Sequence, residues 1–199
     1  MSELEPDVVD LLAGVAPGSR LAAIRVRRPQ ARQNAQASYV ALFAPRFPGG
    51  VGAEARYAVA TFVAGLHGDG AILAFYRDGL IRLNGDASLV AAVDNEIARG
   101  AAHGPYGGYP KGPLSAEDRD GPVLRVAEAN RRILGARLTA ALEHAHLLVF
   151  RPRDASPAAL QSLVDAGWST TDIVTLSQLI AFLSFQIRAV VGLRALAAA

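Results

Sequence analysis

The chain has 199 residues, of which 20 are lysine or arginine and 18 are aspartate or glutamate, so its formal charge is only +2. It contains no cysteine, which excludes disulfides, a cysteine nucleophile, a thiolate metal site and a dithiol redox pair of its own. Hydrophobic residues make up 51% of the chain, enough for a substantial core. We therefore expect a single folded domain over residues 1–199.

The first seven residues, Met1 to Asp7, contain neither a basic n-region nor an apolar h-region. A secretory signal is not expected from this pattern, and we predict a cytoplasmic protein.

One stretch of the chain is strongly basic. Six arginines and no acidic residue lie between Asp10 and Glu54. No helix-turn-helix, zinc-finger or aromatic ladder accompanies them, so we expect solvated arginines or ion pairs with acids elsewhere, and no nucleic-acid partner.

Local patterns predict several helices in the N-terminal half, residues 1–100. A short helix is expected over 7–12, a loop over 13–19, and a segment over 20–28 that Pro29 interrupts. A helix is expected over 30–42, followed by a Pro- and Gly-rich break. Apolar residues recur at helical spacing over 53–67 and 71–83, and a further helix is expected over 88–99.

A long irregular stretch, residues 101–122, separates this half from the C-terminal half, residues 123–199. A helix interrupted near Gly135 is expected over 123–149. Ser156 and Pro157 supply an N-cap and first-turn proline for a helix that stops at Gly167. Residues 169–172 resemble a capping box and predict a long helix to about Leu196. Since no segment alternates with period two, the sequence predicts an all-α protein.

The last helix carries an uncharged run from Ile173 to Ile187. Its 15 residues fall short of the roughly 20 that span a bilayer. We therefore predict a core or oligomer-interface helix and no membrane partner.

The same region is similar to a known family. Gly167, Ser169 and Ile173 begin a pattern that continues with Ala181, Phe182, Phe185, Arg188, Gly192 and Leu193. At these spacings the chain resembles the carboxymuconolactone decarboxylase-like family, and within it the alkylhydroperoxidase-D-like, peroxidase-related branch. The resemblance covers residues 53–83 and 141–196.

This resemblance implies an all-helical, alkylhydroperoxidase-D-like fold that assembles as a dimer, trimer or hexamer, here through residues 170–196. An active family member is a further candidate partner. The resemblance also implies a thiol peroxidase site, in which a Glu and a His assist a Cys-x-x-Cys pair. This chain has no cysteine, so that chemistry cannot be transferred to it.

The family's site positions fall on other residue types here. In the alignment that we favour, Asp69 and Ile72 stand at the two cysteine positions, Tyr76 at the His and Tyr57 at the Glu. A shift of a few residues would instead place His67 at the first cysteine and bring Glu54 close to the Glu position. The alignment that we favour leaves a candidate catalytic cluster of His67, Asp69, Tyr76 and Tyr57, and neither alignment supplies a sulfur.

These candidates have structural interpretations as well. His67 and Asp69 are typical of an acid/base pair, and Asp69 among glycines is equally typical of a helix cap. His144 and His146 are two residues apart, which disfavours a shared metal ion, whereas Glu143 and His146 could pair. Arg188 would form a salt bridge or contact a substrate carboxylate. No cofactor or metal is expected.

Two functions follow from these observations. The first is a cysteine-less family member without thiol peroxidase activity that binds a small molecule or serves in assembly. The second is an enzyme with non-thiol acid/base chemistry, decarboxylase- or isomerase-like, that uses His67 and its neighbours.

Overall fold

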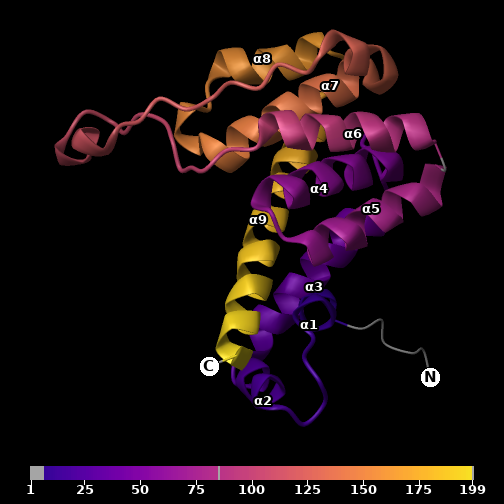
Figure 1. Cartoon of the computed structure of the whole chain (residues 1–199), viewed down its shortest axis with the longest axis vertical. Helices are drawn as coiled ribbons and strands as arrows, with labels where there is room; N and C mark the ends of the chain where they lie inside the picture. The colour runs from indigo at the N-terminus through magenta and orange to yellow at the C-terminus, as the bar shows by residue number, and fades with distance from the viewer. Residues whose placement is uncertain (1–6, 85, 199) are drawn as a thin grey trace.

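Two of the predicted helix starts in the C-terminal half carry the expected capping contacts. Figure 1 shows a computed structural model of the chain, which describes residues 7–84 and 86–198. The Ser156 hydroxyl accepts from the N–H of Ala159, and Ser169 and Asp172 accept reciprocally from each other's N–H groups. The capping box predicted for residues 169–172 is therefore confirmed.

The described residues form helices and contain no strand, which confirms the predicted all-α class. In chain order the helices are α1 (Val8–Ala13), α2 (Arg20–Val26), α3 (Pro29–Phe43), α4 (Ala53–His67), α5 (Gly70–Asn84), α6 (Ala87–Gly100), α7 (Glu128–Phe150), α8 (Pro157–Asp165) and α9 (Thr170–Ala198). Two short 3-10 helices, η1 (Pro113–Glu117) and η2 (Pro152–Asp154), lie in the connections.

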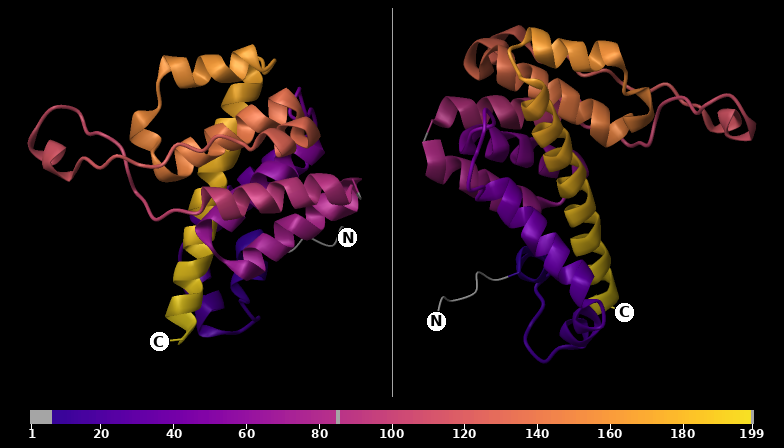
Figure 2. Two further views of the ribbon diagram at one scale, coloured as in Figure 1. Left: turned by 45° about the horizontal axis from the view of Figure 1, so that its top comes forward. Right: turned by 180° about the vertical axis from the view of Figure 1, so that it is seen from behind.

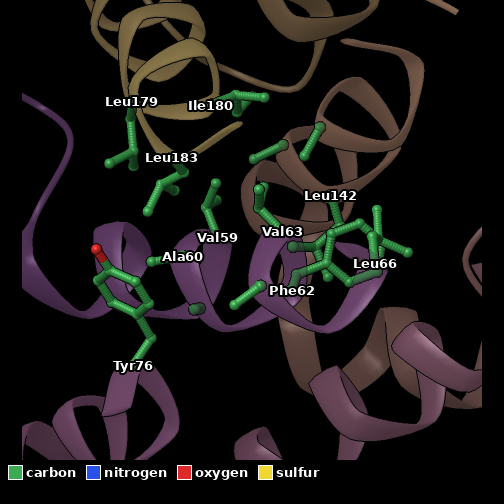
Figure 3. Packing of buried hydrophobic residues seen from close by; sticks show 14 of the residues in the cluster. Val59, Ala60, Phe62, Val63, Leu66, Tyr76, Leu142, Leu179, Ile180 and Leu183 are labelled. Atoms are coloured by element: carbon green, nitrogen blue, oxygen red, sulfur yellow. The ribbon is translucent and has the colours of Figure 1, made fainter. Parts of the chain in front are cut away.

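Helix α4 lies at the centre of the molecule and packs against α5, α6, α7 and α9. Its face toward α9 is apolar, so Val59 and Val63 meet Leu183 and Ile180 in the core (Figure 3). Burying such a side chain stabilises the fold by about 1.5–3 kcal/mol. The apolar spacing over residues 53–67 thus produces the helix that organises the core.

Helix α9 runs the length of the molecule (Figures 1 and 2). The helices α7 and α8 pack near its start, and α1 and α2 pack near its end. Two helices, Glu128–Phe150 and Thr170–Ala198, are long and apolar enough to cross a membrane, and 61% and 39% of their most apolar windows are buried in the fold. The lower value marks α9 as the helix with an uncovered apolar face.

Residues 101–127 form an arm that leaves the body after α6 and returns at α7 (Figure 2). Within it η1 and an antiparallel bridge between Gly107 and Arg119 give local order. The predicted helix over 123–149 was wrong at its start, because residues 123–127 are extended and α7 begins at Glu128. The predicted interruption at Gly135 is confirmed by its φ of 69°.

Two of the basic residues between Asp10 and Glu54 are used in ion pairs. The guanidinium of Arg25 lies 2.6 Å from Asp10, and that of Arg32 lies 2.8 Å from the same carboxylate. These groups line a hollow of about 630 Å³ between α1 and α2, together with Asp7. These ion pairs link α1 to α2 and α3.

Candidate functional site

His67 is the last residue of α4, immediately before Gly68, which takes the left-handed conformation of a helix C-cap. Its side chain is half-buried, and its Nε2 lies 3.3 Å from the hydroxyl of Ser184 on α9. Burial, assisted by the positive charge of Arg188, lowers the pKa of His67 to about 4. The imidazole is therefore neutral at pH 7.

Asp69 caps α5, as the structural interpretation of the sequence predicted. One carboxylate oxygen accepts from the N–H of Ile72 at 3.0 Å, and the other lies 2.7 Å from Arg194 near the end of α9. Burial opposes ionisation, but these donors outweigh it and hold the pKa of Asp69 below its usual value. Asp69 thus pairs with Arg194, and it does not orient His67.

Tyr76 is fully buried and points toward α9 (Figure 3). Its hydroxyl donates to Oε1 of Gln186, and its ring stacks on Phe43 and lies 6.4 Å from the ring of Tyr57. Burial, reinforced by the neighbouring Tyr39, raises the pKa of Tyr76 well above its usual value. Tyr76 and Tyr57 therefore belong to an aromatic cluster in the interior.

The four candidate residues do not form one cluster. Tyr57 and His67 are ten residues apart on α4, roughly 15 Å along the helix axis. Asp69 and Tyr76 are separated by about two turns of α5, roughly 10 Å. The structure brings Tyr57 and Tyr76 together and leaves His67 and Asp69 with different partners, because adjacent residues at a helix junction point in different directions.

Arg188 lies exposed on α9, where two surface hollows meet. Each hollow has a volume of about 540 Å³. The first lies between the end of α4, residues 101–105 and α7, and includes His67 and His103. The second follows α7 and α9 and includes Ser184 and Phe185. Both are bounded by Arg188, Pro105 and Val149.

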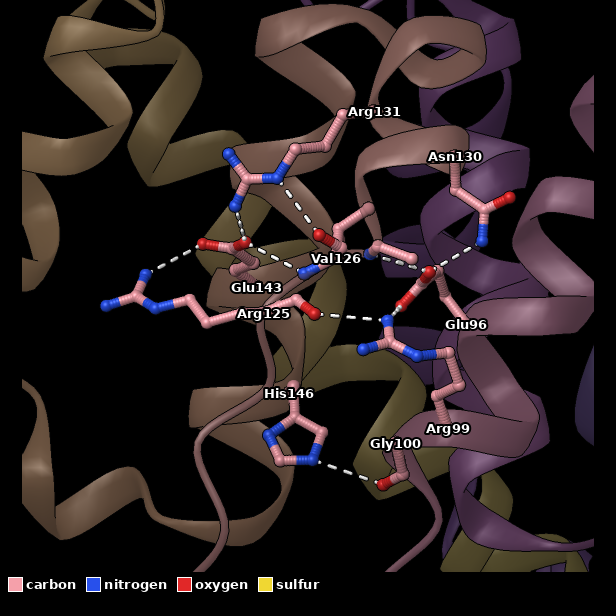
Figure 4. A network of polar contacts seen from close by, with 10 residues as sticks. Glu96, Arg99, Gly100, Arg125, Val126, Asn130, Arg131, Glu143 and His146 are labelled. Atoms are coloured by element: carbon pink, nitrogen blue, oxygen red, sulfur yellow. Dashed lines mark hydrogen bonds and ion pairs between the residues drawn. The ribbon is translucent and has the colours of Figure 1, made fainter.

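The histidines of α7 have structural partners. His144 Nε2 lies 3.0 Å from the hydroxyl of Ser177, and His146 Nε2 lies 3.1 Å from the carbonyl of Gly100. The predicted pairing of Glu143 with His146 is wrong, since Glu143 accepts from the arm that precedes α7 (Figure 4). Over residues 7–84 and 86–198, no group of three His, Cys, Asp or Glu side chains could hold a metal ion.

Sequence reasoning missed Ser184 and His103 as neighbours of His67 and Arg188. Ser184 contacts His67 from 117 positions further along the chain, and His103 lies in the arm. No spacing in the sequence links these residues, because the packing of α9 on α4 and the path of the arm bring them to the hollow.

Protonation of the histidines should destabilise the fold below neutral pH. The pKa values of His67, His144 and His146 are all lowered by burial, whereas an unfolded histidine has a pKa near 6.5. Because the unfolded chain binds more protons between about pH 4 and 6.5, the free energy of unfolding falls as the pH drops through this window. We expect His67 to contribute about 1–2 kcal/mol of this loss between pH 7 and 4.5, after allowance for its partial exposure.

Urea unfolding at both pH values checks this expectation. The His67→Gln variant should lose less stability than the wild type over the same interval. An identical loss in the two proteins would show that His67 titrates normally in the folded state.

No protein family, curated protein or solved structure matches this chain.

Proposed function

We propose that this chain is a cysteine-less, alkylhydroperoxidase-D-like protein of the carboxymuconolactone decarboxylase-like kind, without thiol peroxidase activity. It pairs with a second copy of itself through α9 and binds a small molecule beside that helix. The observation that carries the proposal is an exposed apolar stripe on α9, formed by Val174, Ala181, Phe185 and Gly192 and here called the α9 stripe.

The α9 stripe lacks a covering element within the described part of the chain. Val174 is 55% and Phe185 is 52% exposed, although the opposite face of α9 is in the core. At about 100° per residue the four positions fall within about 20° of one line along the helix. An apolar line that stays exposed on a helix whose opposite face is buried is suited to a partner.

The α9 stripe is complementary to itself. In an antiparallel pair about a two-fold axis at Leu183, Val174 lies level with Gly192 of the second copy, and Phe185 lies level with its Ala181. Each larger side chain thus meets a smaller one, which lets the helices approach closely. This isologous arrangement favours a second copy of the chain as the partner, and a dimer as the basic unit.

The residues that stand at the family's two cysteine positions support the proposed absence of thiol chemistry. Asp69 is held by Arg194 and the start of α5, and Ile72 is fully buried. Neither residue can form a thiolate or be oxidised to a disulfide by a peroxide.

The acid/base alternative has one observation in its favour, the neutral imidazole of His67 in a hollow beside Arg188. Its expected partners, Asp69 and Tyr76, bind Arg194 and Gln186. We therefore favour binding and assembly over catalysis. The cytoplasmic location, and the absence of nucleic-acid and membrane partners, are further parts of the proposal.

Val174→Glu should dissociate the dimer without unfolding the chain. Val174 is exposed in the single chain, so the change is tolerated there, but a carboxylate opposite glycine in the pair would be desolvated without a partner. Light scattering should give twice the 20.8 kDa chain mass for the wild type and a single chain for Val174→Glu at the same concentration.

Leu83→Glu is the matched control, because Leu83 is 50% exposed on α5, outside the α9 stripe. It should retain the wild-type mass. A wild-type mass of one or three chains, or a Val174→Glu dimer, would contradict the pairing. Turnover of an alkyl hydroperoxide with a dithiol donor would contradict the proposed absence of peroxidase activity.

A further inference from the structure

Arg188 is a cation without a carboxylate partner among the described residues. No aspartate or glutamate lines either hollow beside it. The carboxylates nearest the two ends of α9 are engaged elsewhere, Asp172 by Arg137 and Asp69 by Arg194. Among residues 7–84 and 86–198, Arg188 therefore forms no ion pair and keeps its guanidinium donors available.

The position of Arg188 on α9 places its charge at the edge of both hollows. It lies about 40° from the line of the α9 stripe, on the side that carries Ser184. The Ser184 hydroxyl contacts His67, so a cation, a hydroxyl and a neutral imidazole border the same pair of hollows. A guanidinium can hold a carboxylate by two parallel hydrogen bonds.

The remaining walls of the second hollow are apolar. Leu148 and Val149 of α7 face Ile180 and Phe185 of α9, and Pro105 closes one side. Apolar walls with a few polar groups at one point are typical of sites that hold an amphipathic small molecule in one orientation.

We propose that the two hollows bind a small carboxylate with an apolar body, its carboxylate on Arg188 and its body between α7 and α9. The inference rests on the small-molecule-binding part of the proposed function and supplies its ligand class.

The surroundings favour a single negative charge on the ligand. Arg188 is the one permanent cation that lines the two hollows in the described part of the chain. The C-terminal end of α4, at Leu66 and His67, borders the first hollow with the partial negative charge of a helix terminus. A phosphate dianion would meet that negative end with only one cation to balance it, so a monocarboxylate fits better.

Titration calorimetry with three probes tests the assignment. Octanoate provides the charge and the apolar body, 1-octanol the body alone, and inorganic phosphate the charge alone. Octanoate should bind at least tenfold more tightly than either of the others, because only octanoate combines charge-assisted hydrogen bonds with burial of an apolar body.

Variants locate the binding site. Arg188→Gln should weaken octanoate binding at least tenfold, and Arg188→Lys should recover part of the loss because it keeps the charge. The control Arg82→Gln removes an exposed arginine from α5 and should bind like the wild type. Because Arg188 has no ion pair within the described chain, Arg188→Gln should unfold at the wild-type urea concentration.

Two outcomes would overturn the assignment: octanoate binding that Arg188→Gln leaves unchanged, and octanol binding as tight as that of octanoate. Repeating the titration on Val174→Glu separates this inference from the proposed assembly. Octanoate binding that persists in a single-chain Val174→Glu protein supports the site, while the masses of the wild type and of Val174→Glu decide the pairing.

Discussion

Replacing Glu96 with alanine is expected to lower the free energy of unfolding by about 3 kcal/mol, because the change removes an acceptor from three donors. Glu96 lies on α6 and its carboxylate is fully buried. It accepts from the N–H of Ala127 at 3.0 Å, from the amide of Asn130 at 2.6 Å and from Arg99 at 2.5 Å (Figure 4). Without it, the Ala127 and Asn130 donors have no acceptor at the point where the arm enters α7.

Thermal or urea unfolding measures this loss, which corresponds to a fall in Tm of roughly 6–12 °C for a chain of this size. Glu96→Gln should lose less, since an amide oxygen can still accept from the two neutral donors but not pair with Arg99. The matched control is Glu128→Ala, which removes an exposed carboxylate 3.7 Å from Arg132 and should change stability by less than about 0.5 kcal/mol. Equal losses for Glu96 and Glu128 would show that the arm is not held by this carboxylate.

The same contacts explain why the start of α7 could not be predicted from the sequence. Residues 123–127 have suitable helix formers, so local propensity extends the helix over them. In the fold, Val126 and Ala127 donate instead to Glu143 and Glu96, which are 17 and 31 positions away in the chain. Propensity describes only the neighbours within a turn or two, and the tertiary acceptors override it.

Boundaries set by local chemistry were predicted well. The expected helix over 53–67 has the same limits as α4, and Ser156, Pro157 and Ser169 occupy the capping positions assigned to them. Each depends on contacts between residues three or four positions apart, which the sequence displays directly.

In the candidate site, too, local contacts could be predicted from the sequence and tertiary contacts could not. The cap role of Asp69 follows from its neighbours, and the structure confirms it. Its ion pair joins it to Arg194, 125 positions away, and the partner of His67 is Ser184. Which helix lies beside the α4–α5 junction is a property of the whole fold, so the sequence could identify the residues but not their partners.

The other large effect is expected at Arg56, a buried charged residue of the central helix α4. Its guanidinium is buried and donates to three backbone carbonyls. The acceptors are Val51 at 2.7 Å, Leu42 at 2.7 Å and Pro48 at 2.9 Å. The planar guanidinium of one side chain therefore holds the end of α3 and the connection to α4 against each other.

Asp172 adds to this junction from the start of α9. Its carboxylate accepts from the N–H of Gly50 at 2.9 Å, and a Cβ at Gly50 would lie 2.5 Å from the carboxylate. Burial lowers the pKa of Arg56, and the charge of Asp172 partly offsets this. The connection over residues 44–52 is thus held from both sides, by a buried cation on α4 and a carboxylate on α9.

Arg56→Met should lower the free energy of unfolding by about 3 kcal/mol, since three carbonyls, two of them in buried hydrogen bonds, lose charge-assisted donors while the apolar stem is kept. Arg56→Lys should lose about 2 kcal/mol, because one ammonium cannot reproduce the planar fork that reaches all three. Urea unfolding gives both values, with Arg82→Met as an exposed control expected within about 0.5 kcal/mol of the wild type.

Amide hydrogen exchange distinguishes a local effect from a general one. In Arg56→Met, exchange should accelerate first over residues 44–52, which lose their anchor, and less over the core of α4. If the loss of stability instead left exchange in this connection unchanged, the carbonyl contacts of Arg56 would not be what holds it against α4. The lost stability would then come from the guanidinium acting elsewhere, through the charge of Asp172, because the methionine retains the packing of the stem.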